Sequence, residues 1–219
     1  MDTGFWHNRW QKDEIAFHQG KVNQRLLDHW TRLNLPANVR VFVSLCGKAL
    51  DLVWLRDQGH RVLGIELSPI AVRDFYAENN LTPHISQQGN FERWEAGDIA
   101  ILLGDFFAMN STDALDVAAI YDRASLIAFP PAMREDYARH LQAIMPRQAK
   151  MLLVTLEYLQ AEMDGPPFSV TEAEVRRLYE RGYRIEKLSS EGVLDEFPRF
   201  QEKGLRYLTE TAYRLTPLG

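Results

Sequence analysis

The sequence predicts an α/β fold in which a mostly parallel sheet is covered by helices on both faces. Short, continuous apolar runs alternate with segments of helical periodicity along most of the chain. This alternation is typical of parallel strands that are buried on both faces. The chain has 219 residues and shows neither a low-complexity linker nor an internal repeat. We therefore expect a single domain that spans residues 1–219.

The first element is expected to be helical. Apolar residues recur at near-helical spacing from about Trp10 to Leu33, and Pro36 closes the segment. Because no strand precedes this segment, we expect residues 1–36 to form an N-terminal helical cap on the sheet.

The next four elements follow from buried apolar runs and helical periodicity. Ser68 and Pro69 favour the N-cap and the first turn of a helix. The predicted elements are a strand at Val39–Leu45, a helix at Lys48–Gln58, a strand at Arg61–Glu66 and a helix from Ser68 to about Asn79.

The second half of the chain continues the pattern after a polar interruption at Thr82–Gly97, where we expect a short extra hairpin. Thr171 followed by Glu174 is a capping-box pattern and marks a helix start. The predicted elements are strands at Ile99–Leu103, Val117–Tyr121 and Lys150–Leu156, helices at Met133–Met145 and Thr171–Gly182, and final antiparallel strands at Tyr183–Leu188 and Leu205–Leu215.

Composition limits the function classes. The net charge is −5, which argues against a surface for nucleic acid or for an anionic membrane. Cys46 is the single cysteine, so no internal disulfide forms, as suits a reducing compartment. The N-terminus lacks a signal pattern and no apolar run reaches membrane length. The histidines show no shared metal-ligand spacing. We expect a cytoplasmic monomer without a metal.

The end of the first strand and the end of the second carry the main ligand signal. Gly47 lies in the turn after the first strand, and Glu66 ends the second. In open α/β folds these strand ends meet at the ligand edge of the sheet. Gly47 lets the backbone approach a ligand, and Glu66 can accept hydrogen bonds from both ribose hydroxyls. The turn lacks the glycine run of a dinucleotide site, which favours S-adenosylmethionine over NAD.

The third and fourth strands also end in polar residues. Asp105 could be an ordinary turn residue, but it could also accept a hydrogen bond from the amine of an adenine ring that Phe106 covers. Asp122 and Arg123 follow the fourth strand. Arg123 could form an internal salt bridge, or it could face the carboxylate of the cofactor or an anionic acceptor.

Two further features lie near this predicted site. Aromatic residues are dense in the first ten positions, including Trp10. They either fix the N-terminal helix to the core or form a lid, where an indole ring would attract a sulfonium cation. Cys46 is expected to be a small buried residue because no sequence feature supplies it with a base.

Several segments together resemble the thiopurine S-methyltransferases, especially the bacterial ones. The resemblance covers nearly the whole chain and is carried by RWQKDEIAFHQGKVN, SLCGKALDLVWLRDQGHRVLGIELSPIAV, GDFF, YDRASLIAFPPAMR and GPPFSV. It implies a class I methyltransferase fold, which is Rossmann-like, with S-adenosylmethionine as cofactor. The implied acceptor is a thiol on a small aromatic heterocycle. Some bacterial members are associated with selenium or tellurium oxyanions, which makes a metalloid acceptor and tellurite resistance further expectations.

The resemblance also implies roles for individual residues. Phe17 matches a position at the acceptor, and Arg123 and Arg199 match arginines near it. Arg199 lies in a stretch that resembles the family only loosely. The positions that match cofactor contacts are Trp10, Leu45, Glu66, Asp105, Phe106 and Arg123.

The expected chemistry is direct displacement, in which an acceptor thiolate attacks the sulfonium methyl group. Holding the two groups about 3 Å apart and in line can contribute about 7–11 kcal/mol. A thiol with a pKa of roughly 8.5 ionises partly near neutrality, so we assign Arg123 and Arg199 to orientation and charge stabilisation and propose no obligatory base. Two alternatives remain: a nicotinamide-dependent oxidoreductase, and a non-catalytic resistance protein that binds an adenosyl ligand or a metalloid.

Overall fold

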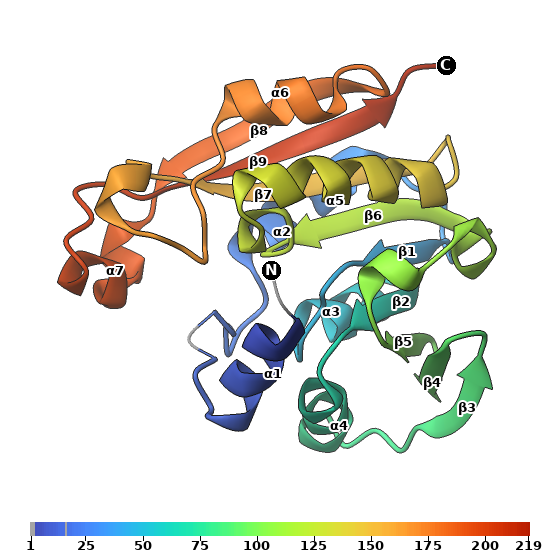
Figure 1. Cartoon of the computed structure of the whole chain (residues 1–219). Coiled ribbons are helices and arrows are strands. Elements are labelled where there is room, and N and C mark those ends of the chain that lie inside the picture. Colours follow the sequence, from blue (N-terminus) through green and yellow to red (C-terminus); the bar gives the residue numbers. More distant parts are fainter. Residues whose placement is uncertain (1–2, 16) are drawn as a thin grey trace.

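The computed structural model describes residues 3–15 and 17–219. Its strands form one sheet in the order β3-β4-β5-β2-β1-β6-β7-β9-β8 (Figure 1). The strands are β1 (Arg40–Val43), β2 (Arg61–Glu66), β3 (His84–Gln88), β4 (Phe91–Ala96), β5 (Ile99–Leu103), β6 (Val117–Arg123), β7 (Lys150–Glu157), β8 (Tyr183–Gly192) and β9 (Thr209–Pro217). The α-helices are α1 (Thr3–Gln11), α2 (Gln24–His29), α3 (Asp51–Asp57), α4 (Pro69–Glu78), α5 (Pro131–Ile144), α6 (Glu172–Tyr179) and α7 (Pro198–Glu202).

The centre of the sheet is parallel. Strands β5, β2, β1, β6 and β7 pair in parallel, whereas β9 and β8 extend one edge in antiparallel pairing. The hairpin β3-β4 extends the other edge. The mostly parallel sheet, the extra hairpin and the antiparallel final strands are therefore confirmed. The strand order reverses between β1 and β6, so the carboxyl ends of these strands are where an open sheet of this kind forms its ligand crevice.

The predicted helix from Trp10 to Leu33 is wrong. Helix α1 ends at Gln11, α2 begins at Gln24, and a short 3-10 helix covers Trp30–Leu33. Asp13 has a φ of 56°, which no right-handed helix contains, and Asn23 caps α2 by accepting a hydrogen bond from the backbone N–H of Arg25. The apolar spacing in this region comes from two helices and a connecting segment that bury their apolar residues separately. The role of residues 1–36 as a cap stays a prediction.

Other predicted boundaries shift by a few residues. Helix α3 begins at Asp51 instead of Lys48, because the chain is still turning after β1. Strand β6 continues through Arg123, so Asp122 and Arg123 are strand residues with side chains on opposite faces of the sheet. Strand β9 begins at Thr209 instead of Leu205, which belongs to a small apolar cluster with Phe200.

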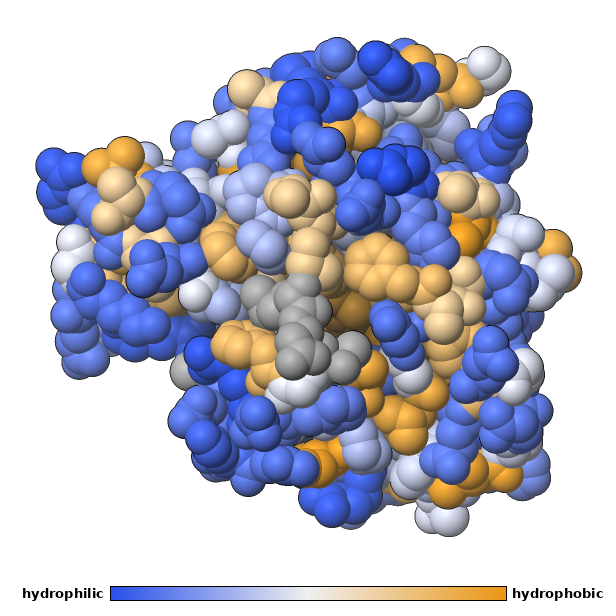
Figure 2. Space-filling view, viewed as in Figure 1, coloured by the Kyte–Doolittle hydropathy of each residue, from blue (hydrophilic) through white to orange (hydrophobic). Residues whose placement is uncertain are grey.

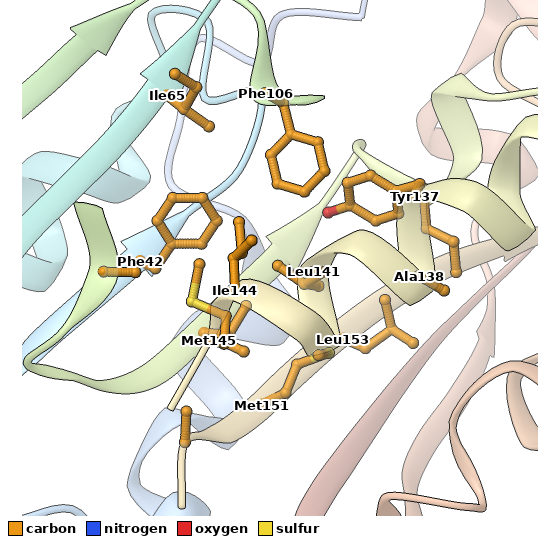
Figure 3. Close-up of a cluster of buried hydrophobic side chains, with 14 of the residues drawn as sticks. Phe42, Ile65, Phe106, Tyr137, Ala138, Leu141, Ile144, Met145, Met151 and Leu153 are labelled. Carbon is orange, nitrogen blue, oxygen red and sulfur yellow. The ribbon is translucent and has the colours of Figure 1, made fainter. Parts of the chain in front are cut away.

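Helices cover both faces of the sheet. On one face, Tyr137 and Leu141 of α5 pack against Phe42 of β1 and Phe106 (Figure 3). On the other face, α2, α3 and α4 contribute apolar side chains to a second buried cluster, which includes Leu26, Leu52 and Phe75. Because both faces are covered, a ligand reaches the central strands only at their ends. In the described part of the chain, no helix has both the length and the apolar character needed to cross a membrane.

Candidate active site

A pocket lies at the carboxyl ends of the central strands, and helix α1 with the segment after it forms part of its wall. Figure 2 shows apolar residues gathered in the middle of the same face of the molecule, with polar residues around them. The residues predicted to bind the cofactor or the acceptor all line this pocket: Trp10, Phe17, Leu45, Glu66, Asp105, Phe106, Arg123 and Arg199. These residues come from seven separate segments, so the fold brings together what the sequence only suggested.

The loop after β1 has an unusual backbone. Leu45 has a φ of 45° and Gly47 a φ of 53°, and a leucine in the left-handed region is uncommon enough to indicate a functional constraint. An added Cβ at Gly47 would meet the Trp10 ring at 3.4 Å, an ordinary contact, so it is the positive φ that favours glycine here. Cys46 is 5% exposed, as expected for a small buried residue, and its Sγ would lie 2.8 Å from a Cβ at Gly64.

Glu66 ends β2 as a buried carboxylate that is 6% exposed. One oxygen accepts the backbone N–H of Gly47 at 2.8 Å, and the other accepts that of Ser68 at 2.7 Å. Burial raises the pKa of Glu66, and these backbone hydrogen bonds limit the rise. The carboxylate thus fixes the β1 loop and keeps further lone pairs available toward the pocket. This arrangement fits a ribose, whose two hydroxyls are donors.

Asp105 and Phe106 follow β5. The carboxylate of Asp105 is exposed and caps a short 3-10 helix by accepting the backbone N–H of Phe107 at 2.9 Å. Phe106 borders the pocket, but its ring is 2% exposed and lies 4.9 Å from the ring of Tyr137 in the core. Asp105 is therefore both a turn residue and a pocket residue, and the contact of either side chain with adenine stays a prediction.

Arg123 forms the internal salt bridge that the sequence left open, and it also lines the pocket. Its partner is Asp51 of α3, with Nη2 and Oδ2 3.0 Å apart, while Asp122 faces the other way. Burial by itself lowers the pKa of Arg123, but the charges and hydrogen bonds of Asp51 and Tyr121 together outweigh it and the net shift is upward. The Nε atom of Arg123 is buried without a partner among the described residues. The guanidinium is thus permanently charged and retains a donor.

Arg199 of α7 is a half-buried cation that lines the pocket. Within residues 3–15 and 17–219, it makes no ion pair. Its guanidinium carbon lies over the Phe200 ring, 4.6 Å from the ring centroid, as in a cation–π contact. Burial lowers the pKa of Arg199. Its Nε also lacks a partner in the described part of the chain. A desolvated, unpaired guanidinium in a pocket is a site for an anion.

Aromatic rings line the N-terminal side of the pocket. Phe17 lies edge-on to Trp6 and Trp10, with ring centroids 5.6 Å and 5.7 Å apart. Trp10 is 6% exposed, whereas Trp6 and Phe17 are half-buried. These contacts exclude water from this side of the pocket. The lid and the fixed attachment both stay predictions.

Beneath the pocket, Asp122 is the centre of a buried polar cluster. Its carboxylate accepts hydrogen bonds from the Tyr137 hydroxyl at 2.8 Å and from the backbone N–H of Leu126 at 3.2 Å. The Tyr137 hydroxyl also lies 2.6 Å from the Ser44 hydroxyl, and Ser125 donates to the Ser44 carbonyl at 2.7 Å. The cluster joins the loop after β1 to the loop after β6. It therefore fixes two walls of the pocket relative to each other.

Replacing Asp122 by asparagine should change how stability depends on pH. Burial raises the pKa of Asp122 to about 6 from an ordinary 3.8. Its folded pKa exceeds its unfolded pKa, so its stabilising contribution is complete below about pH 4 and is lost as pH rises through about 6. The wild-type free energy of unfolding, relative to Asp122→Asn, should fall by up to about 3 kcal/mol between about pH 4 and pH 7. Urea unfolding at several pH values measures this, with exposed Asp57→Asn as control. A constant difference would contradict the assignment.

Sequence reasoning missed several pocket residues. Asp51, Tyr121 and His18 all line the pocket, and burial, followed by the charge of Lys48, lowers the pKa of His18. Asp51 follows the glycine turn directly, which was a signal that could have been used. No three or more His, Cys, Asp or Glu side chains in the described chain form a group able to hold a metal ion.

Comparison with known proteins identifies the family. The family described as "Thiopurine S-methyltransferase (TPMT)" matches residues 1–217. The chain belongs to this family. A thiopurine S-methyltransferase of Pseudomonas fluorescens (strain Pf0-1) is 48% identical over 98% of this chain and 99% of its own. One of Pseudomonas paraeruginosa (strain PA7) is 52% identical over the same shares of the two chains.

Solved structures confirm the fold of this thiopurine S-methyltransferase family member. A 1,6-didemethyltoxoflavin-N1-methyltransferase of Burkholderia thailandensis matches with a TM-score of 0.63 at 14% identity, over 98% of this chain and 87% of that one. A SAM-dependent methyltransferase of Anabaena variabilis matches with a TM-score of 0.65 at 16% identity, over 99% and 95%. The family assignment makes the protein an enzyme that uses S-adenosylmethionine, and the predicted class I methyltransferase fold is confirmed.

Proposed function

We propose that this enzyme transfers the methyl group of S-adenosylmethionine to the sulfur of a small aromatic or heterocyclic thiol. One observation supports this acceptor most strongly. The pocket combines aromatic walls with two guanidinium groups, Arg123 and Arg199, whose Nε atoms have no partner among the described residues. An apolar ring that carries a thiolate matches this combination of surfaces. The names of the relatives agree with it.

The cofactor half of the site would be formed by the loops after β1, β2 and β5. Glu66 would accept hydrogen bonds from the ribose hydroxyls, with the positive-φ loop at Leu45 and Gly47 beneath them. Asp105 and Phe106 would lie at the adenine, and Trp10 would cover the sulfonium end, where its ring face favours a cation. S-adenosylmethionine supplies the electrophilic methyl group when it is bound.

The acceptor half would be formed by Phe17, Arg123 and Arg199. Phe17 would contact the flat ring of the acceptor, and the two guanidiniums would favour its thiolate over its thiol. Both charges decrease as thiolate and sulfonium react, so a pocket closed to water by aromatic rings suits the reaction. This arrangement requires no general base, since a thiol is partly ionised near neutrality.

An acceptor panel tests the proposal. Thiopurines, simple aromatic thiols, the matching phenols and amines, and selenite or tellurite would be incubated with S-adenosylmethionine, and products identified by mass. We expect S-methylation of the aromatic thiols. Methylated selenium or tellurium products would show that the acceptor site also takes metalloid species. Methylation of the phenols or amines in preference to the thiols would contradict the proposal. A test of NADH binding addresses the oxidoreductase alternative, and sequestration without turnover would favour the binding protein.

Replacing Arg199 by methionine should weaken acceptor use specifically. Methionine keeps most of the packing against Phe200 and removes the charge. We expect kcat/KM for an aromatic thiol to fall about 10- to 100-fold, as for a lost charge-assisted contact, with the affinity for S-adenosylhomocysteine unchanged. The loss should be smaller at alkaline pH, where the thiol ionises without help. Arg206→Met, which removes an exposed arginine of the same region paired with Glu162, is the control. An equal loss at every pH would argue against thiolate stabilisation.

A further inference from the structure

Asp51, the first residue of α3, is a buried carboxylate at the wall of the pocket. Its side chain is 1% exposed. Its Oδ2 accepts hydrogen bonds from Nη2 of Arg123 at 3.0 Å and from the Tyr121 hydroxyl at 3.2 Å. Its Oδ1 accepts the backbone N–H of Asn23 at 2.8 Å. One carboxylate therefore connects the pocket arginine on β6 to the start of α2.

Asn23 ends the part of the chain that covers the pocket. We call residues 17–23 the covering segment, because Phe17, His18 and Gln19 all line the pocket. Asn23 is 3% exposed, and its amide donates to Glu210 at 3.3 Å and to the Gln19 side chain at 3.4 Å. The end of the covering segment is therefore held by Asp51 and by β9 together.

We propose that Asp51 is a positioning residue for methyl transfer, which orients Arg123 toward the acceptor and fixes the covering segment through the same carboxylate. This inference rests on the role proposed above for Arg123. With Nη2 bonded to Asp51, the guanidinium is restricted, and its Nε is buried without a partner among the described residues. Holding the Arg123 guanidinium in one orientation matters, because a small displacement of a group at the reacting centre lowers the reaction rate.

The geometry makes Asp51→Asn a sharp test. The Arg123 guanidinium and the Tyr121 hydroxyl donate to Oδ2 of Asp51, and the Asn23 N–H donates to Oδ1. Each side of the carboxylate therefore needs an oxygen. Asparagine has the same shape but only one oxygen. Its amide nitrogen would have to face either Arg123 or Asn23, and one of the two contacts would be lost.

The experiment is a double-mutant cycle with Asp51→Asn and Arg123→Lys, using an aromatic thiol as acceptor. We expect Asp51→Asn to lower acceptor kcat/KM about 30-fold or more, on the scale of a misplaced catalytic contact. S-adenosylhomocysteine affinity should change less than about 3-fold, and the double variant should be about as active as Arg123→Lys alone, because the two residues act as a unit. Glu174→Gln, which removes a carboxylate that pairs with Arg134 away from the pocket, is the matched control and should be unaffected.

A second measurement follows the covering segment itself. Lys21 lies in this segment with its side chain 75% exposed, so limited trypsin digestion reports whether the segment is held in place. Cleavage after Lys21 should be several-fold faster in Asp51→Asn than in the wild type or Glu174→Gln, at equal global stability. Unchanged cleavage would overturn the link to the covering segment.

The kinetic results distinguish a failure of the inference about Asp51 from a failure of the role proposed for Arg123. If Asp51→Asn is folded and keeps its acceptor kinetics, or if the two losses multiply, Asp51 does not act through Arg123 and the inference is overturned. If Arg123→Lys alone leaves acceptor kinetics unchanged, the proposed role of Arg123 fails first. If Asp51→Asn does not fold, Asp51→Glu keeps both oxygens and the charge while displacing them, and the same cycle with that variant decides the question.

Discussion

Replacing Arg123 by methionine is expected to lower the free energy of unfolding by about 3–5 kcal/mol, because it leaves the Asp51 carboxylate buried without its cation. Asp51 is 1% exposed, and its other contacts are a tyrosine hydroxyl and a backbone N–H. Hydrogen bonds of this kind only partly compensate a buried charge. Denaturant unfolding at neutral pH measures the loss. Adding Asp51→Asn to the variant should restore much of the stability, since the uncompensated charge is then gone.

The same replacement is expected to lower kcat/KM for the acceptor by at least about 100-fold per folded molecule, as for removal of a charge-stabilising donor. Arg134→Met is the matched control. Arg134 is also buried and pairs with Glu174 at 3.0 Å, but neither residue lines the pocket. Its variant should lose stability and retain the acceptor kinetics. Equal kinetic losses in the two variants would show that Arg123 matters only for folding.

Replacing Glu66 by glutamine is expected to weaken binding of S-adenosylhomocysteine by about 1–3 kcal/mol, or about 5- to 150-fold. Both oxygens of Glu66 already accept backbone N–H groups, from Gly47 and Ser68. A glutamine amide would place its N–H₂ against one of these donors, so the loop and the ribose would lose an acceptor together. Calorimetric titration at neutral pH gives the affinity.

Two comparisons define the Glu66 result. Glu78→Gln, which removes an exposed partner of Lys48, should leave the affinity within about 2-fold. Because burial raises the pKa of Glu66, wild-type affinity should fall toward acid pH as the carboxylate is protonated, and the glutamine variant should lack this dependence. Unchanged cofactor affinity in a folded Glu66→Gln protein would remove the ribose assignment.

Much of the site could be predicted because strand ends are readable from sequence. Buried apolar runs ending at Glu66, Leu103 and Tyr121 predicted that Glu66, Asp105 and Arg123 lie at one edge of the sheet. Phe17 and Arg199 came only from family resemblance. The periodicity of apolar residues does not predict where a residue outside the sheet will lie. The positions of Phe17 and Arg199 at the site could therefore be predicted only from related sequences.

The helix expected at Trp10–Leu33 shows where sequence reasoning fails. Its apolar residues keep a helix-like spacing, yet Asn23, just before α2, bonds to distant parts of the chain. Asn23 contacts Asp51 and Glu210, and such partners leave no local signal. Asp51 was missed although it follows the glycine turn, because a lone acid after a turn looks like a solvated helix start.

Asn23 and Arg25 share a partner, Glu210 of β9, that lies far away along the sequence. Glu210 is 185 residues beyond Arg25 and 187 beyond Asn23. Ribosomes extend a chain at roughly 5–20 residues per second, so the N-terminal segment emerges about ten seconds or more before its anchor exists. The contacts that hold Asn23 and Arg25 against β9 therefore form only after Glu210 has been synthesised, well after the start of α2 itself.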